Sequence, residues 1–293
     1  MILPVEAELE QFVLGPESVA WRTTSDVRLN LAMLYPLLLQ VAHPTVDAGV
    51  SDFSEFEHEP WARVRRTIDY LSAIVYGGRD ALSAGRRLRT LHKRFKGTNA
   101  KGRRYSALEP EAYAWVHATL LDTFVRANAR FCAPMNAAER ECFYREYRGL
   151  GRLIGVRESD LPPTWPQFCD YFAETAETHL TRTTSVGRVL DALRHLSTPP
   201  RPMPEPLWQA IRIPGRRALW LGGVGMMDPW LRRQLEIDWN SLDEVQFRTI
   251  SILARAAGTV MPTSLKMIGP GRIERSGRLA RPGGRALATG PSS

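Results

Sequence analysis

Apolar residues recur along most of this chain at intervals of three and four positions, the spacing that gives an α-helix one apolar face. No alternation of apolar and polar residues is long enough to predict a strand, and no hairpin signal stands out. The pattern therefore predicts an all-α fold. Its helices are expected over residues 25–42, 60–76, 80–96, 110–131, 136–153, from 166 to 179, 185–196, 207–211 and 244–257.

Glycine and proline residues mark the expected breaks between these helices. Pro36 is expected to kink the first helix, because proline removes a backbone donor. Gly77 and Gly78 should end the helix that begins at Pro60. A basic loop is predicted over 97–109. These breaks divide the chain into a lead-in at 1–24, a single helical domain at 25–262 and a disordered basic tail at 263–293.

A histidine occupies one position of a core-facing stripe. Ala81, Gly85, Leu88 and Phe95 share one face of their predicted helix, and His92 falls in the same row. A buried imidazole must find a partner, which is either a hydrogen bond or a metal. Spacing leaves both interpretations of His92 open.

A second histidine, His117, lies on the apolar face of the helix predicted over 110–131. Upstream, Arg63, Arg66 and Thr67 have the spacing i, i+3, i+4, which places two cations and a hydroxyl on one helix face. A solvated basic face would give the same pattern. Two histidines on apolar faces beside such a helix also suit a cleft for haem, which needs an axial nitrogen and cations for its propionates. A pocket for another anionic organic ligand would use similar residues.

Composition favours a protein with a sizeable core in a reducing compartment. Hydrophobic residues make up 44% of the 293 positions, and the three cysteines form no CxxC pair. The first residues carry no secretory pattern, so we expect a cytoplasmic protein. The most apolar stretch, 29–42, is too short to span a membrane, and nothing in the sequence indicates membrane association.

The formal net charge of +8 is distributed unevenly. Residues 269–293 contain five arginines and one glutamate, a net +4, and no apolar face. This composition predicts a disordered tail. A basic tail of this kind can contact nucleic acid or anionic lipid. The remaining charge of about +4 is too small to predict specific nucleic-acid binding.

Familiar catalytic motifs are missing from the sequence. Gly222-Gly223-Val224-Gly225 lacks the strand, helix and downstream acid of a dinucleotide site. No GxSxG, GKS/GKT, HxxxH or HExxH pattern occurs either. Function must therefore be sought in the histidines and in the arginine-bearing face.

Ordered motifs across residues 20–258 resemble the haem-dependent oxygenase family of the latex-clearing rubber oxygenases and the fungal mpaB-type oxygenase. That fungal enzyme is membrane-bound and cleaves a farnesyl chain. The matching segments are LLLQVAHPTVDAGV (37–50), EPWARVRRT (59–67), LHKRFKG (91–97), YSALEPEAYAWVHATLLDTF (105–124) and GMMDPWLRRQLEIDW (225–239).

The resemblance implies a globin-like helical core that carries haem b. His92 corresponds to the histidine that ligates the haem iron. Arg63, Arg66 and Thr67 correspond to an Arg-x-x-Lys-Thr pattern on the distal side, with Arg66 in place of the lysine. Because arginine is always charged and a poor metal ligand, we expect that side to be open or water-bound.

The resemblance thus predicts roles for each residue. Arg63 and Thr67 would orient dioxygen or substrate, and Arg66 would pair with a propionate. His117 would contact the cofactor or serve as a structural residue, and His43, which also lies in a matching motif, would have a similar role. The catalytic carboxylate of the rubber oxygenases has no clear counterpart; the candidates are Asp47, Asp52 and Glu55.

The sequence is therefore interpreted as a haem-b-dependent oxygenase that uses dioxygen on a hydrophobic substrate, an isoprenoid being one candidate. Two alternatives stay open. The first is a non-enzymatic haem-binding or sensing protein on the same scaffold. The second is a helical interaction protein whose histidines are core residues. The sequence does not predict the oligomeric state.

Overall fold

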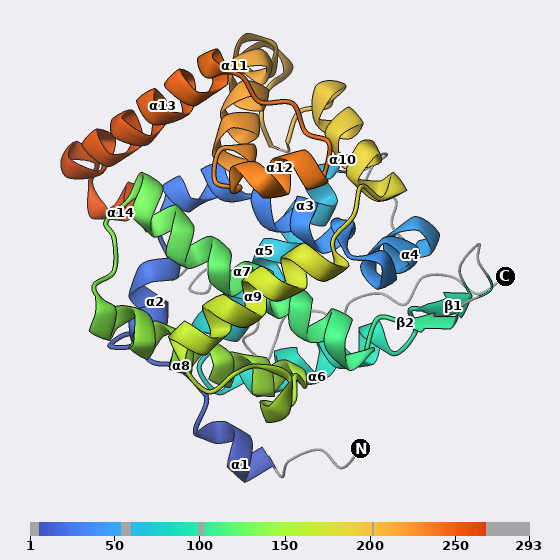
Figure 1. Ribbon diagram of the computed structural model, residues 1–293. Helices are drawn as coiled ribbons and strands as arrows, with labels where there is room; N and C mark the ends of the chain where they lie inside the picture. Colours follow the sequence, from blue (N-terminus) through green and yellow to red (C-terminus); the bar gives the residue numbers. More distant parts are fainter. Residues whose placement is uncertain (1–5, 54–59, 99–101, 103, 201, 268–293) are drawn as a thin grey trace, which may run out of the picture.

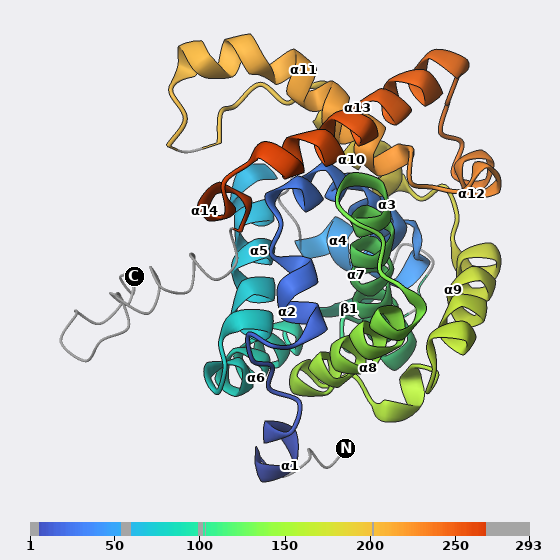
Figure 2. The same ribbon diagram turned by 90° about the vertical axis from the view of Figure 1, so that its left-hand side faces the viewer.

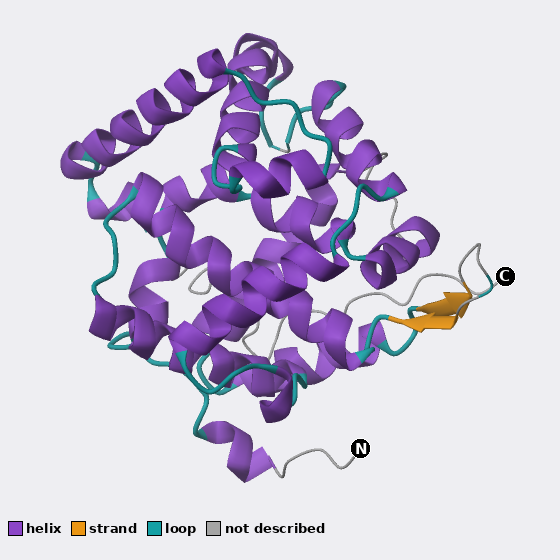
Figure 3. Ribbon diagram, in the orientation of Figure 1, coloured by secondary structure: helices purple, strands orange, loops and turns teal. Residues whose placement is uncertain are grey.

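Helices make up most of the described chain (Figures 1 and 3). The computed structural model describes residues 6–53, 60–98, 102, 104–200 and 202–267. Within these ranges a single two-stranded sheet is the exception to the helical architecture. The all-α fold class is confirmed, whereas the globin-like arrangement of its core stays a prediction.

The elements follow one another along the chain in this order. The first are α1 (Glu6–Glu10), α2 (Val19–Thr24), the 3-10 helix η1 (Val27–Ala32), α3 (Leu34–Ala42), α4 (Pro44–Phe53), α5 (Pro60–Tyr76), α6 (Asp80–His92), β1 (Lys96–Thr98) and β2 (Arg104–Ser106). The later ones are α7 (Pro110–Phe131), α8 (Ala137–Ile154), the 3-10 helix η2 (Glu158–Asp160), α9 (Trp165–His179), α10 (Thr184–Arg194), α11 (Glu205–Val224), α12 (Pro229–Gln234), α13 (Ser241–Val260) and α14 (Thr263–Lys266).

The long helix α7 lies at the centre of the domain (Figures 1 and 2) and contacts η1, α3, α8 and α13. Proline at its first position suits a helix start, because the backbone donor it lacks would be unpaired there. The side chain of Trp115 is completely buried, and its indole Nε1 donates a 3.0 Å hydrogen bond to the Leu39 carbonyl. The core is therefore built around α7, with α3 held against it by both packing and hydrogen bonding.

Two arginines bind the carbonyl end of α7, where the last turn leaves backbone acceptors unpaired. One guanidinium nitrogen of Arg28, in η1, donates 3.0 Å hydrogen bonds to the carbonyls of Phe131 and Ala254. The Arg255 guanidinium of α13 donates to the Arg130 carbonyl at 3.1 Å and to the Ala129 carbonyl. Cations at this end also oppose the negative end of the helix dipole. Residues from both ends of the chain thus meet at one helix terminus.

The segment 25–42, predicted as one kinked helix, is instead two helices. The Asp26 carboxylate accepts a 2.9 Å hydrogen bond from the Arg28 backbone N–H, which caps η1. A separate helix, α3, then begins at Leu34. Pro36 lies in the first turn of α3, where its missing donor costs no hydrogen bond. The prediction of a kink at Pro36 was therefore wrong.

The helix that carries His92 ends earlier than predicted. His92 is the last residue of α6, and the chain then turns into β1, which pairs antiparallel with β2. The Ala107 backbone N–H also donates a 2.8 Å hydrogen bond to the Phe95 carbonyl. A β-hairpin thus occupies part of the segment predicted as a helix end and loop.

The Gly222-Gly223 pair lies inside α11, which is much longer than the 207–211 predicted. A Cβ atom on Gly222 would lie 2.1 Å from the Leu31 carbonyl oxygen, so only glycine lets α11 approach η1 this closely. The glycines therefore allow α11 to pack closely against η1 and α3. This agrees with the sequence, which lacks the other features of a dinucleotide site. Pro214 also lies inside α11, so the backbone hydrogen bond that its N–H would make is missing.

Segments on both sides of the predicted domain, 25–262, contact it. Val19 and Ala20 of the lead-in are buried, and their backbone N–H groups donate to the Glu146 carboxylate of α8. At the other end, α14 and an isolated β-bridge between Asp26 and Met267 extend the fold past residue 262. The disorder predicted for the tail falls on residues 268–293, which lie outside the described residues. None of the described helices is long and apolar enough to cross a membrane.

Candidate functional site

His92 has one ring nitrogen fixed by its own helix. The carbonyl of Leu88, one turn earlier, lies 2.8 Å from Nδ1. Because a carbonyl only accepts hydrogen bonds, Nδ1 carries the proton, and Nε2 of the neutral ring keeps its lone pair. In metalloproteins the second nitrogen of a ligating histidine typically makes a bond of this kind, which fixes the tautomer and the ring orientation. No hydrogen bond to Nε2 is formed among the described residues.

Two aromatic rings frame the half-buried imidazole. Phe95 and Tyr113 both meet it edge to face, with ring centroids 5.8 and 5.6 Å away. The Tyr113 hydroxyl donates a 3.0 Å hydrogen bond to the Ile154 carbonyl at the end of α8. Burial lowers the pKa of His92, although its hydrogen bond to Leu88 opposes the shift. The ring is therefore neutral at neutral pH, the form that binds a metal.

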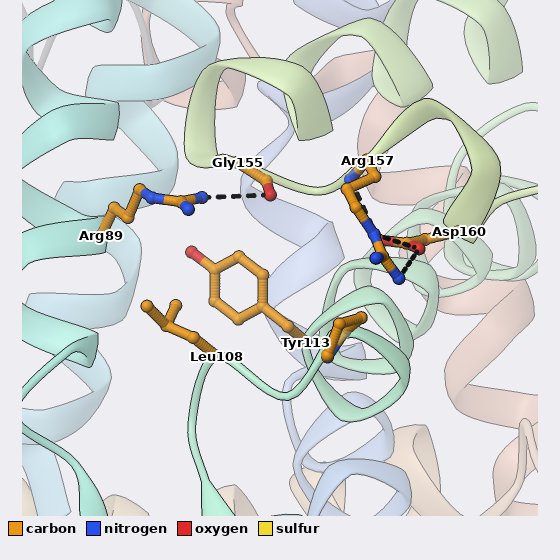
Figure 4. A pocket seen from close by; sticks show the side chains of 7 residues that line it. Arg89, Leu108, Tyr113, Gly155, Arg157 and Asp160 are labelled. Carbon is orange, nitrogen blue, oxygen red and sulfur yellow. Dashed lines mark hydrogen bonds and ion pairs between the residues drawn. The ribbon is translucent and has the colours of Figure 1, made fainter. Parts of the chain in front are cut away.

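Residues that line a small pocket beside Tyr113 hold the end of α8 against α6 (Figure 4). Arg89 points toward the Gly155 carbonyl and donates a 3.2 Å hydrogen bond to it. Gly155 has φ of 95°, so it ends α8 in the left-handed conformation that favours glycine. Across the pocket Arg157 pairs with Asp160 at 2.7 Å. These contacts position the α8 terminus against which Tyr113, and through it the His92 ring, is placed.

Arg63, Arg66 and Thr67 lie in the first half of α5, which packs against α6. Arg63 is half-buried, and burial together with the nearby Arg66 charge lowers its pKa. An arginine remains protonated at neutral pH even so. Arg66 and Thr67 are exposed, and the Thr67 hydroxyl donates a 3.1 Å hydrogen bond to the Arg63 carbonyl. The structure thus brings the two cations together, while the exposure of Arg66 and Thr67 also agrees with a solvated face.

His117 is anchored in the protein core. Its Nε2 donates a 2.8 Å hydrogen bond to the Tyr147 carbonyl, and its ring stacks on that of Tyr147 with centroids 4.8 Å apart. Burial lowers the pKa of His117 to about 4. A Cβ on Gly151 would lie 3.0 Å from Nε2, so the glycine makes room for the ring. This geometry supports the structural role left open by the sequence, and the cofactor contact of His117 stays a prediction.

The carboxylates considered as catalytic candidates make structural contacts where they are described. Asp47 accepts a 2.9 Å hydrogen bond from the Ser185 backbone N–H at the start of α10. Asp52 accepts a hydrogen bond from the Tyr105 hydroxyl of β2. Glu55 lies outside the described residues. Neither described carboxylate gains support as a catalytic group from these contacts.

One cluster was not anticipated from the sequence. The Glu111 carboxylate, in the first turn of α7, lies 3.1 Å from Nε2 of His179 and 4.0 Å from Nε2 of the buried His43. His43 also accepts a 3.3 Å hydrogen bond from the Thr45 backbone N–H, which fixes its ring at the start of α4. No group of His, Cys, Asp and Glu among the described residues, this cluster included, has the geometry to hold a metal ion.

A large apolar groove opens between α11 and α13, with a volume of about 740 Å³. It extends to Trp61, in the first turn of α5, two residues before Arg63. The Trp61 indole donates a 2.7 Å hydrogen bond to the Thr198 carbonyl and meets Trp208 edge to face, with ring centroids 5.7 Å apart. The volume and apolar lining of the groove are typical of sites for small hydrophobic molecules.

The donor chemistry of His92 is compatible with the haem that the resemblance implied. A haem iron needs only one protein ligand, and a neutral imidazole whose Nδ1 is fixed by the Leu88 carbonyl is of the kind that ligates it. Arg63 and Arg66 lie on α5, the helix that packs against α6.

The fold and this site define an all-helical protein in which the helix that ends at His92 packs against the arginine-bearing helix α5. The family model "ER-bound oxygenase mpaB/B'/Rubber oxygenase, catalytic domain" matches residues 21–256. The chain belongs to this oxygenase family. No curated protein and no solved structure gives a significant match.

Proposed function

We propose that this chain is a haem-b-dependent oxygenase that acts on a hydrophobic substrate, with an isoprenoid as the candidate that the family resemblance suggests. The observation that carries the proposal is the geometry of His92, whose Nδ1 is held by the Leu88 carbonyl while Nε2 keeps its lone pair. Membership of the oxygenase family supports the reaction class.

In this proposal His92 holds the iron through Nε2, and the Leu88 carbonyl and the two flanking rings fix its orientation. Haem b, when bound, supplies the iron centre that binds and activates dioxygen. Arg66, as the exposed cation, is assigned to a propionate.

Arg63 supplies a fixed positive charge that stabilises negative charge developing on oxygen. Its partial burial strengthens this effect, because a charge interacts more strongly where water is excluded. Thr67 supplies a hydroxyl one turn away, with its own proton directed to the Arg63 carbonyl. The groove that ends at Trp61 would hold the apolar part of the substrate and exclude water from it.

An absorption spectrum of the protein produced with a supply of haem tests this proposal. The wild-type chain should show a Soret band, and His92→Ala should lose it. His195→Ala is the matched control, because Nδ1 of His195 also bonds the carbonyl four residues earlier, at 2.9 Å, but on an exposed helix end. The control should keep the Soret band.

Two results would contradict the proposal. Full haem occupancy in His92→Ala would exclude His92 as the ligand, and His117 would be tested next. Stable haem binding without consumption of dioxygen with any apolar alkene would favour the haem-binding or sensing alternative.

A further inference from the structure

Large apolar side chains are exposed almost entirely in one part of the structure. Among the described residues Phe53 is the single exposed large hydrophobic residue outside α11, α13 and α14. The others are Leu207, Ile211, Ile213, Leu242, Val245, Ile252, Leu253, Val260 and Leu265. At 100° per residue Ile213 lies about 160° around α11 from Ile211, on the opposite side of that helix. We call the other members of this set on α11 and α13 the α11/α13 face; these two helices lie along the top of the molecule in both views (Figures 1 and 2).

The outward side of α13 is uniformly uncharged. At 100° per residue its exposed apolar side chains fall within an arc of about 100°, in which Thr249 and Ala256 fill the remaining positions. The charged side chains Glu244, Arg248 and Arg255 lie on one flank of this arc. The opposite side of the helix carries Phe247 and Ala254, which are buried. The helix therefore has two apolar faces, and the core covers only one of them.

Positive charge is concentrated in the same part of the chain. Residues 205–293 contain 13 lysines and arginines against 7 aspartates and glutamates, a net charge of +6 out of +8 for the whole protein. Of this +6, +4 lies in residues 269–293, which follow α13 and α14 in the chain, and +2 lies in residues 205–268. The first 204 residues are close to neutral. A basic segment next to helices with exposed apolar side chains is typical of proteins that bind the surface of an anionic membrane.

A second copy of the chain fits the face less well. If two α13 helices packed antiparallel with Leu242 opposite Val260, Arg248 would lie next to Arg255 of the second copy. Both arginines are exposed on the same flank of the helix, so the pairing would juxtapose like charges. The Glu244 carboxylate, 2.8 Å from Arg248, already offsets one of the two charges within each chain. An anionic surface would interact favourably with the exposed Arg255.

We propose that the α11/α13 face docks this protein on an anionic lipid surface, with its apolar side chains inserted below the headgroups. The groove between the two helices supports this, since Ile211 and Leu253 belong both to its lining and to the exposed face. An apolar molecule could pass from the lipid into the groove without crossing water. The docking itself does not depend on haem or on the proposed reaction.

Flotation of the full chain with lipid vesicles tests this inference. At about 0.1 M salt, vesicles of phosphatidylcholine with about 30% phosphatidylglycerol should bind at least about tenfold more protein than phosphatidylcholine alone. The double variant Ile252→Gln/Leu253→Gln, which leaves the charge unchanged, should weaken that binding at least about tenfold. Ala173→Gln, at an exposed position of α9, is the matched control and should bind like the wild type.

If the first pair fails to fold, a second pair replaces it: Leu242→Gln/Val260→Gln, at positions that are 61% and 81% exposed near the two ends of α13. This second pair should weaken vesicle binding by a similar factor. Wild-type protein that does not float with anionic vesicles would overturn the proposal, as would unchanged binding in a folded double variant. A dimer in light scattering that the substitutions convert to monomer would also overturn it, in favour of a second copy.

Discussion

The hydroxyl of Tyr35 donates a 2.7 Å hydrogen bond to the carboxylate of Asp122, and both side chains are buried between α3 and α7. Arg126 completes the group by pairing with the same carboxylate at 2.9 Å and with Asp228 at 3.3 Å. Burial raises the pKa of the Asp122 carboxyl, and the Arg126 charge opposes that shift. This network links α3, α7 and the start of α12 across the core.

Asp122→Asn should destabilise the fold strongly. Removal of one partner leaves the Arg126 charge without its buried counterpart, which costs about 3 kcal/mol in comparable pairs. Tyr35→Phe, which removes one hydrogen bond to the same carboxylate and leaves the Arg126 ion pair in place, should cost less, about 2 kcal/mol. Urea unfolding of both variants measures the two losses, and equal losses would argue against the charged network.

The buried His117 should make stability depend on pH. Its folded pKa of about 4 lies below the 6.5 of an ordinary histidine, so protons bind more readily to the unfolded chain. The free energy of unfolding is therefore unaffected by this histidine above pH 6.5. It falls as the pH drops from 6.5 to about 4, by about 3 kcal/mol in total.

His117→Gln keeps an N–H donor for the Tyr147 carbonyl but cannot titrate. Its free energy of unfolding should therefore change less across this pH range than that of the wild type. His195→Gln, at an exposed helix end, serves as the control. An equally steep dependence in His117→Gln would show that another group is responsible.

Gly85 sets how closely α6 approaches α8, and so where His92 lies at the end of α6. A Cβ at this position would lie 2.2 Å from the Leu153 carbonyl oxygen, so a shift of the backbone would be needed. Gly85→Ala should cost about 2 kcal/mol or more and lower haem occupancy. Gly187→Ala is the control in α10, where the nearest atom is 4.0 Å away, and it should stabilise the helix by up to about 1 kcal/mol. Melting curves distinguish the two, and a tolerated alanine at 85 would contradict the packing argument.

Arg63→Ala should retain haem but lose at least about tenfold in dioxygen turnover, because a fixed charge near the developing negative charge is removed. Thr67→Ala should have a smaller effect, since a neutral hydroxyl contributes less than a charge. The exposed Arg65→Ala on the same helix is the control. If all three variants match the wild type in spectrum and turnover, the residues form a solvated face.

Deletion of residues 271–293 should leave the folded body intact, because this segment has no apolar pattern with which to join a core. The expected result is an unchanged melting temperature and haem content. A markedly lower melting temperature would show that the tail packs against the domain.

Periodicity found most of the longer helices but missed α2, α4, α12 and most of α11. It also found the buried face of α6, because Ala81 and Gly85 repeat at helical spacing and both are buried. It placed the end of that helix too late, because the turn after His92 depends on the pairing of β1 with β2. That pairing is a tertiary effect that overrides local propensity. Likewise, α13 carries two apolar faces, and spacing alone cannot say which of them the core covers.

The candidate site was predictable only in part. His92, Arg63 and Arg66 stood out because they are close in sequence and match family motifs. Glu111 and His179 were missed because 67 positions separate them, and only the packing of α9 against the start of α7 brings them together. No local pattern marks such a pair.

The two arginines at the carbonyl end of α7 have a consequence for the order in which the chain folds during synthesis. Arg28 is made early, but one of its two acceptors is the Ala254 carbonyl, and Arg255 arrives with it. A nascent chain can therefore bring α3 and α7 together long before the end of α7 is secured, and the last turn stays frayed until α13 has left the ribosome. Ribosome-bound chains stalled before residue 250 should accordingly be cut by protease near Phe131, and chains stalled after the tail should resist.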